Sequence, residues 1–174
     1  LWRRGVEGRG TIPGGAGPIA GLPAWYVEAQ LKKFQTGLRG AHPDDYEGLR
    51  MRPMSRQMQT DGEVRAGAAY VSTLPAAKPA ASVAGGDAAA GAAAYGMCSA
   101  CHGPGGAGNE QMKAPPLAGQ ADWYLMAQLK KFKGGIRGVA PGDVTGSQMR
   151  PMALGLTDEQ AMKNVVAHIS KMSR

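Results

Sequence analysis

The sequence has few cysteines, histidines and aromatic residues, and it has no long apolar run. Of its 174 residues two are Cys and three are His, and Phe, Trp and Tyr together make up 6%. No stretch of about 18 apolar residues occurs, so the sequence predicts no transmembrane segment. No signal peptide is visible and residue 1 is Leu rather than Met, from which we expect a processed or incomplete form of the chain.

Positive charge exceeds negative charge in this chain. The formal net charge is +7, from 20 Lys and Arg against 13 Asp and Glu. The basic residues are spread along the chain without a nucleic-acid-binding motif, so we expect no nucleic-acid partner. Long-range attraction favours a protein partner with an acidic face instead.

Both cysteines and one histidine fall in a single motif, Cys98-Ser-Ala-Cys101-His102. Two thiols three residues apart, with His directly after the second, form the attachment signature of a c-type haem. Each thiol adds to one vinyl group of the porphyrin, and the imidazole binds the iron. A redox dithiol would not need the His, and a zinc site would need two further ligands where only His42 and His168 remain. The motif therefore predicts one covalently bound haem c, which leaves no cysteine for a disulfide.

The chain also repeats itself. A shift of 98 positions aligns residues 1–75 with residues 99–173 without a gap, and about a third of the aligned positions are identical, which chance does not give. Matching segments are Trp25-Tyr26 with Trp123-Tyr124, Gln30–Phe34 with Gln128–Phe132, and Met51–Met54 with Met149–Met152. We therefore predict two small domains, 1–75 and 87–174, joined over residues 76–86 by an Ala/Pro/Gly linker that we expect to be solvated.

Periodicity and capping signals predict an all-α fold in which short helices are separated by long Gly- and Pro-rich loops. Asp87 is the expected N-cap of an Ala-rich helix that leads into the haem motif. Asp122 is the expected N-cap of a helix over residues 123–133. Residues 157–160, Thr-Asp-Glu-Gln, indicate a capping box that opens a last helix to about Met172.

A methionine follows the loop that we expect over residues 139–148. Met149 lies about 47 residues past His102, far enough for the chain to reach the other face of a porphyrin. A methionine sulfur there would close the iron and raise its reduction potential. Most of the ten methionines are expected to fill the core, but Met149 and Met152 are placed on what we expect to be an irregular segment and are the candidates for a distal ligand.

Together the motifs resemble the class I cytochromes c, and the tandem arrangement resembles the two-domain c4-type bacterial cytochromes. The resemblance covers nearly the whole chain and rests on the haem motif, the Gly-rich loop after it, Pro115–Gln120, Trp123-Tyr124, Gln128-Leu129, Met149-x-x-Met152 and Leu156–Asp158. It implies thioether bonds at Cys98 and Cys101, a proximal ligand at His102, a distal ligand at Met149, and at Pro115 the carbonyl that accepts from the imidazole. It further implies four neighbours of the haem, which are Leu117, Trp123, Tyr124 and Arg150. The propionates would lie beside Trp123, Tyr124 and Arg150.

The first copy departs from that family pattern. Arg3 and Arg4 stand at the positions aligned with Cys101 and His102, and an Arg offers iron no lone pair. We therefore predict a degenerate first domain without haem, in which Met51 packs in a filled pocket. A second haem is expected only if the N-terminus is incomplete.

The resemblance implies electron transfer rather than enzymatic catalysis, with one electron carried on a His/Met-ligated haem. A retained domain without haem favours a cytochrome subunit of, or donor to, a larger respiratory redox complex. The expected partners are redox proteins such as a terminal oxidase, a reductase or a dehydrogenase. Covalent haem attachment implies a periplasmic or otherwise extracytoplasmic location, with any membrane association made through a partner. The alternative is an open-site haem enzyme or haem sensor that acts on a small ligand such as peroxide.

Overall fold

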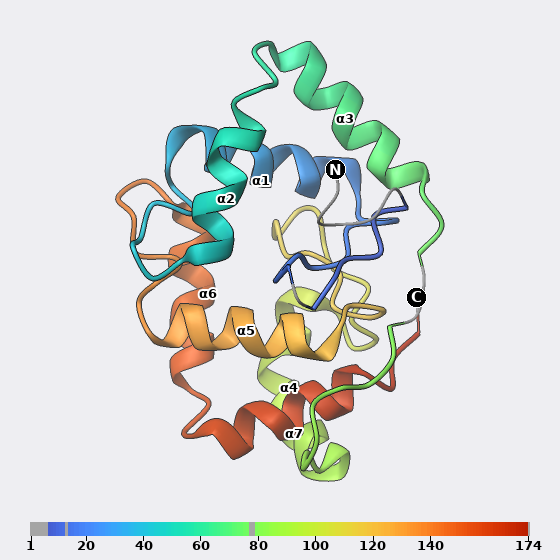
Figure 1. Cartoon of the computed structure of the whole chain (residues 1–174). Helices are drawn as coiled ribbons and strands as arrows, with labels where there is room; N and C mark the ends of the chain where they lie inside the picture. The colour runs from blue at the N-terminus through green and yellow to red at the C-terminus, as the bar shows by residue number, and fades with distance from the viewer. Residues whose placement is uncertain (1–6, 13, 77–78, 174) are drawn as a thin grey trace.

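The computed structural model describes residues 7–12, 14–76 and 79–173. Within them the chain forms seven helices joined by loops (Figure 1). These are α1 (Ala24–Thr36), α2 (Tyr46–Ser55), α3 (Asp61–Thr73), α4 (Ala88–His102), α5 (Asp122–Lys133), α6 (Val144–Leu154) and α7 (Glu159–Ile169). The expected all-α fold is confirmed. None of the described helices is both long enough and apolar enough to cross a bilayer.

The internal repeat is present in the structure. Helices α1, α2 and α3 recur as α5, α6 and α7 at a spacing of 98 residues. Even the isolated backbone bridges correspond, since Thr11 pairs with Ala16 and Asn109 pairs with Ala114. The tandem arrangement is therefore confirmed. Residues 7–76 are called the first half below, and residues 79–173 the second half. Helix α4 has no counterpart among the described residues of the first half.

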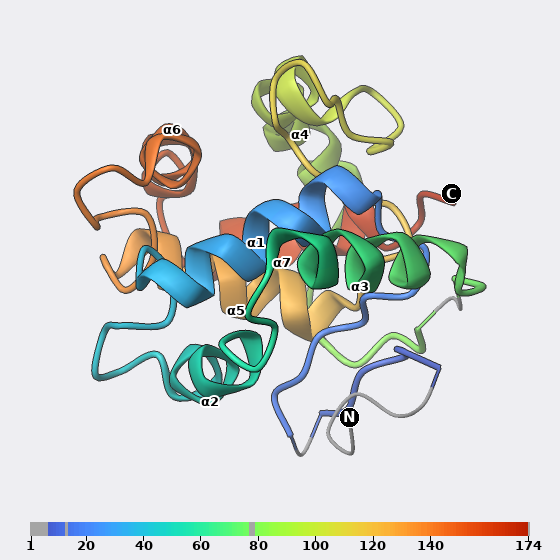
Figure 2. The ribbon, with the colours of Figure 1, turned by 90° about the horizontal axis from the view of Figure 1, so that it is seen from above.

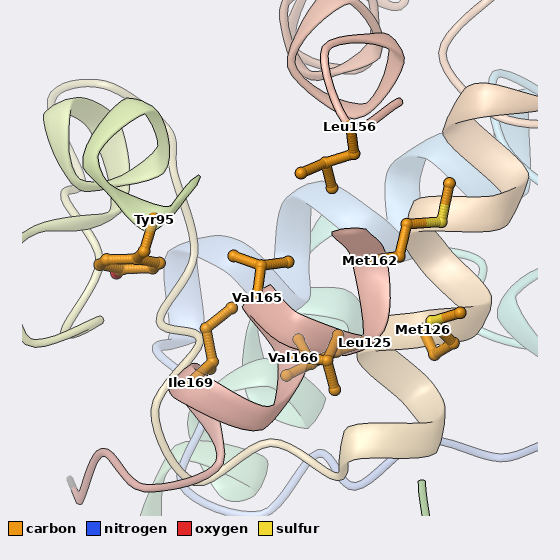
Figure 3. Packing of buried hydrophobic residues seen from close by; sticks show 8 residues of the cluster. All are labelled: Tyr95, Leu125, Met126, Leu156, Met162, Val165, Val166 and Ile169. Carbon is orange, nitrogen blue, oxygen red and sulfur yellow. The ribbon is translucent and has the colours of Figure 1, made fainter. Parts of the chain in front are cut away.

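The second half is built around the crossing of α4 and α7, which pack against each other. Gly91 permits the close approach, because a Cβ added to it would lie 1.9 Å from the Asn164 backbone oxygen. The core around the crossing draws on α4, α5 and α7 and the loop before α7 (Figure 3): Tyr95, Leu125, Met126, Leu156, Met162, Val165, Val166 and Ile169. Each fully buried side chain of this size contributes about 1.5–3 kcal/mol.

The first half has a smaller core between α1 and α3. Its buried apolar residues are Leu22, Val27 and Ala68, with Leu31 and Val71 packed at the edge. In Figure 1 α3 lies at one end of the molecule, and α4 and α7 lie at the other. No described helix therefore covers α3 in the way that α4 covers α7, and Tyr70 of α3 is 62% exposed.

Two expected helix starts are wrong in detail. Helix α5 begins at Asp122 itself, so Ala121 is at the N-cap position, and no side chain caps the helix. Helix α7 is capped by Asp158, whose carboxylate accepts from the Ala161 amide, and it ends at Ile169. A complete capping box occurs instead in the first half, where Thr60 and Glu63 exchange hydrogen bonds at the start of α3. The second half has no such box because Ala161 replaces the glutamate and offers no acceptor.

The segment that carries Met149 is helical, which corrects the expectation of an irregular loop. Helix α6 starts after Asp143, whose carboxylate accepts from the Gly146 amide at 3.1 Å, and it continues through Pro151. The Gly and Pro residues over 139–148 predict a loop from local propensity. The cap at Asp143 outweighs them, and Met149 and Met152 therefore lie one turn apart on a regular helix.

Most described residues of the linker are exposed, as expected for a solvated segment, but Ser82 and Val83 are held against the second half. The Asp122 carboxylate accepts from the amides of Ser82 and Val83 at 2.6 and 2.8 Å and from the Ser82 hydroxyl at 2.6 Å. Val83 packs against the core of the second half. Asp122 is buried, and a buried carboxylate needs such donors. The role expected for Asp122 at a helix terminus is replaced by this long-range contact.

The two halves are joined by reciprocal ion pairs. Lys33 of α1 reaches Asp143 and Thr145 of the second half, and Lys131 of α5 reaches Asp45 and Glu47 of the first half. These positions are equivalent in the repeat. Viewed from above, α1 lies over α5 near the middle of the molecule (Figure 2). The interface is therefore approximately two-fold symmetric, with the Lys of each half paired to the helix cap of the other.

Candidate functional site

The haem motif occupies the last turn of α4. Asp87 caps this helix, as expected, by accepting from the amides of Ala89 and Ala90. Because residues three and four apart share a helix face, Cys98, Cys101 and His102 lie together on one face. All three side chains line one cavity of about 250 Å³. The two cysteines do not form a disulfide with each other, and burial raises the pKa of the Cys98 thiol, with a smaller contribution from Cys101.

His102 is held in a defined orientation. Its Nδ1 lies 2.7 Å from the Pro115 carbonyl oxygen, so with Nδ1 protonated the imidazole donates to this carbonyl and keeps Nε2 free for a metal. Burial lowers the pKa of His102, although the contact with Pro115 opposes the shift. The ring is therefore neutral at pH 7 and fit to act as a ligand.

Three methionines bear on the choice of distal ligand. Met149 and Met152 both line the cavity, and so does Met51 of the first half. Met54, which is the repeat equivalent of Met152, is 52% exposed. The repeat position that holds Met51 in the first half and Met149 in the second half thus faces the cavity in both halves. The position that holds Met54 and Met152 faces the cavity only in the second half. This difference favours Met149 over Met152.

The remaining predicted haem neighbours fall into two groups. Leu117 and Tyr124 line the cavity, whereas Trp123 and Arg150 are not among its lining residues. Trp123 packs edge-on against Tyr124, with ring centroids 5.9 Å apart. The Nε of Arg150 is buried and has no hydrogen-bond partner among the described residues. Arg3 and Arg4 lie outside the described residues.

The cavity extends into the first half, so the expectation of a filled pocket around Met51 is wrong. Its lining there is apolar and includes Ile19, Leu22, Val27 and Phe34. The first half therefore keeps a hollow at the place equivalent to the haem pocket of the second.

Sequence reasoning missed four polar residues between the two hollows: Gln30, Arg39, Gln128 and Arg137. Arg39 donates to Gln30 at 2.7 Å and, across the boundary between the halves, to the Tyr124 hydroxyl at 3.1 Å and to Gln128 at 3.2 Å. Arg137 donates to Gln128 at 2.6 Å and across the boundary to Gln30 at 3.1 Å. Their repetition at a spacing of 98 residues was the available signal, but nothing in the sequence shows that the two copies face each other.

The cavity suits a haem by its chemistry as well as by the position of the thiols. Most of its lining is apolar, and its cationic side chains are Lys33, Lys113, Arg39 and Arg137. Among these lining residues, all within the described part of the chain, there is no Asp or Glu. Such a lining fits a large flat apolar ligand that carries negative groups at its edge. A haem with two propionates is such a ligand.

Comparison with known proteins agrees with this geometry. The family model for cytochrome c matches residues 88–173. A thiosulfate dehydrogenase electron acceptor from Stutzerimonas stutzeri (strain A1501) is 34% identical over 160 residues, which cover 86% of this chain and 69% of the relative.

Two solved structures share the whole fold. Cytochrome c4 of Acidithiobacillus ferrooxidans superposes with a TM-score of 0.74 at 27% identity over 97% of this chain and 96% of its own. Thiosulfate dehydrogenase (TsdBA) from Marichromatium purpuratum, in its "as isolated" form, has a TM-score of 0.76 at 30% identity. That match covers 97% of this chain but only 35% of the larger protein, so this chain spans about a third of its length.

The fold, the haem motif and the repeat define an electron-transfer haem protein with two tandem domains. The chain belongs to the cytochrome c family, as a tandem-domain class I c-type cytochrome. Its haem is a covalently bound haem c, for which Cys98 and Cys101 provide the attachment motif.

Proposed function

We propose that this cytochrome carries one electron at a time on a haem that Cys98 and Cys101 would attach and that His102 and Met149 would ligate. The observation that carries this proposal is the convergence of these four side chains on one cavity. The haem supplies the ferric/ferrous couple. Cys98 and Cys101 would attach it, His102 would bind the iron in the orientation that Pro115 fixes, and the sulfur of Met149 would be the second protein ligand, which favours the reduced state. With His102 and Met149 both bound to the iron, the site would transfer electrons and would leave no place for a small ligand to react.

The partner that we propose is a thiosulfate-oxidising dehydrogenase that passes its electrons to this chain. Support comes from the relative named as a thiosulfate dehydrogenase electron acceptor and from the fold shared with part of the TsdBA protein. The net charge of +7 favours a partner with an acidic docking face. Because covalent haem attachment in bacteria takes place outside the cytoplasm, we also propose a periplasmic location.

We propose one covalent haem for this chain, on the second half. Residues 1–174 contain no second pair of cysteines for another attachment, although the hollow of the first half leaves room for an apolar ligand. The first half would then act mainly as a structural and docking platform. A count of two covalent haems in the protein as produced by its host would contradict this assignment and would place a second attachment site outside residues 1–174.

The test is a pyridine haemochrome assay combined with intact mass, followed by stopped-flow mixing of the oxidised protein with a reduced thiosulfate dehydrogenase. We expect one haem per chain, no change of the reduced spectrum with carbon monoxide, and rapid reduction by the enzyme that slows as salt rises. A shift of the spectrum with carbon monoxide would favour the open-site enzyme or sensor instead. Absence of covalent haem would overturn the whole proposal.

A further inference from the structure

The arginine pair between the halves lacks negative partners. Among the described residues neither Arg39 nor Arg137 forms an ion pair with a carboxylate, although nine of the ion pairs found there involve other Lys or Arg residues. Asp45 acts on Arg39 electrostatically, but its carboxylate is already paired with Lys131. A partly buried guanidinium whose hydrogen-bond partners are all uncharged is costly, so the cavity that both arginines line is the place to look for an anion.

Both arginines have hydrogen-bond donors left for such an anion. A guanidinium carries five N–H donors. Within the described residues Arg39 uses three of them, toward Gln30, Tyr124 and Gln128, and Arg137 uses two. Each guanidinium also lies over a phenylalanine of its own half, Arg39 at 4.7 Å from Phe34 and Arg137 at 4.6 Å from Phe132, measured to the ring centroid. The planar groups are thus fixed in orientation, with donors remaining for carboxylates.

From these observations we infer that Arg39 of the first half, together with Arg137, binds the propionates of the haem attached to the second half. Arg39 crosses the boundary between the halves through its bonds to Tyr124 and Gln128, both of which line the cavity. The first half therefore supplies part of the haem site of the second and helps to set its reduction potential. This inference rests on the proposed function, because it requires the haem.

The expected sign follows from charge. The oxidised haem carries one positive charge more than the reduced haem, so a nearby guanidinium disfavours oxidation and raises the potential. Removal of Arg39 should therefore lower the potential. Because Arg39 is half-buried, the effect should be less sensitive to salt than that of an exposed arginine.

The test compares the midpoint potentials of holoprotein variants by spectroelectrochemical titration at one pH and salt concentration. Arg39→Gln should lower the ratio of reduced to oxidised protein at a fixed potential by about tenfold, which is about 59 mV for one electron. Arg39→Lys, which keeps the charge but loses the planar fork, should recover part of the loss. The matched control is Arg65→Gln, because Arg65 is exposed on α3 of the same half, and it should leave the potential unchanged.

A haem-loaded Arg39→Gln protein whose potential equals that of Arg65→Gln would overturn the inference and leave the proposed function intact. If Arg39→Gln does not fold, the redox-difference infrared spectrum of Arg39→Lys decides. A shift of the propionate carboxylate band relative to wild type supports the inference, and an unchanged band contradicts it. Loss of haem from the wild-type protein would contradict the proposed function itself.

Discussion

The last helix of each half has the same place in the repeat but different surroundings. Helix α7 is crossed by α4, and its Val165 and Ile169 are almost fully buried. The equivalent positions in α3 are Gly67 and Val71, which are only half-buried. His168 of α7 packs on the Tyr95 ring at 5.3 Å, whereas its equivalent Tyr70 is exposed. Helix α4 therefore contributes the apolar partner of α7 as well as the haem motif.

The stability of each half also depends on the other half. Asp45 and Asp143 cap α2 and α6, and each also pairs with a lysine of the opposite half. Because these carboxylates are buried, loss of either lysine leaves a buried unpaired charge. The first half, which lacks the haem motif, therefore contributes to the stability of the second half, which carries it.

The largest contrast between the halves concerns covalent attachment. The double substitution Cys98→Ser and Cys101→Ser should abolish covalent haem completely, because no other thiol exists in the chain. Intact mass should lose the whole mass of one haem. Met54→Ala, at an exposed position of the first half, should retain a full haem content. Covalent haem in the double variant would show that attachment does not depend on this motif.

The distal methionines give the next contrast. Met149→Ala should open the iron to carbon monoxide and lower the midpoint potential by more than about 59 mV, a tenfold change for one electron, because a methionine ligand favours the reduced state. Met51→Ala removes the equivalent side chain of the first half and should leave both properties unchanged. The measurement is a redox titration with a carbon monoxide difference spectrum. Equal effects of the two substitutions would indicate a haem in each half.

The reciprocal lysines should affect stability in similar ways. Lys131→Met and Lys33→Met should each cost about 3–5 kcal/mol, because Asp45 or Asp143 is left buried and unpaired. For a chain of this size that corresponds to a fall in Tm of roughly 10 °C. Thermal unfolding followed by circular dichroism measures the effect. Lys32→Met, which removes exposed ion pairs with Glu28 and Asp61, should change Tm very little. If Lys131→Met changed Tm as little as Lys32→Met does, the halves would not stabilise each other through this ion pair.

The smallest effect is expected at Asp122, which exists only in the second half because Ala24 holds the equivalent position. Asp122→Asn should cost about 1–3 kcal/mol and increase hydrogen exchange at the amides of Ser82 and Val83. Burial raises the pKa of Asp122, but hydrogen bonds from Ser82, Val83 and Trp123 outweigh it and hold the pKa below its usual value.

The pH dependence of this contribution follows from the lowered pKa. The stabilisation by Asp122 is fully present above its unfolded-state pKa of about 3.9 and is lost as pH falls through the lower folded-state pKa. Urea unfolding of wild type and Asp122→Asn from pH 6 down to pH 2 should therefore converge in acid. A difference that stays constant over this range would exclude an ionised Asp122 as the cause.

The helices differ in how far local sequence signals predicted them. Asp87 with its Ala-rich run gave the correct start of α4, because the cap bonds only neighbouring amides. Asp122 was misassigned as an N-cap, because all of its donors except the Trp123 amide lie about forty residues earlier in the chain. Helix α6 was not predicted, because the Gly and Pro residues over 139–148 favour a loop locally, whereas the cap at Asp143 stabilises the helix.

By itself the sequence determined the features of the protein that depend only on the spacing of residues along the chain. The motif from Cys98 to His102 established covalent haem chemistry, and the shift of 98 residues established the two domains. Only the tertiary structure decided which residues meet across the two halves, including the lysine pairs and the contact of Arg39 with Tyr124. The physical reason is that an ion pair or a shared cavity depends on distance in space, and the relative placement of two repeats is set by packing that the repeat pattern does not encode.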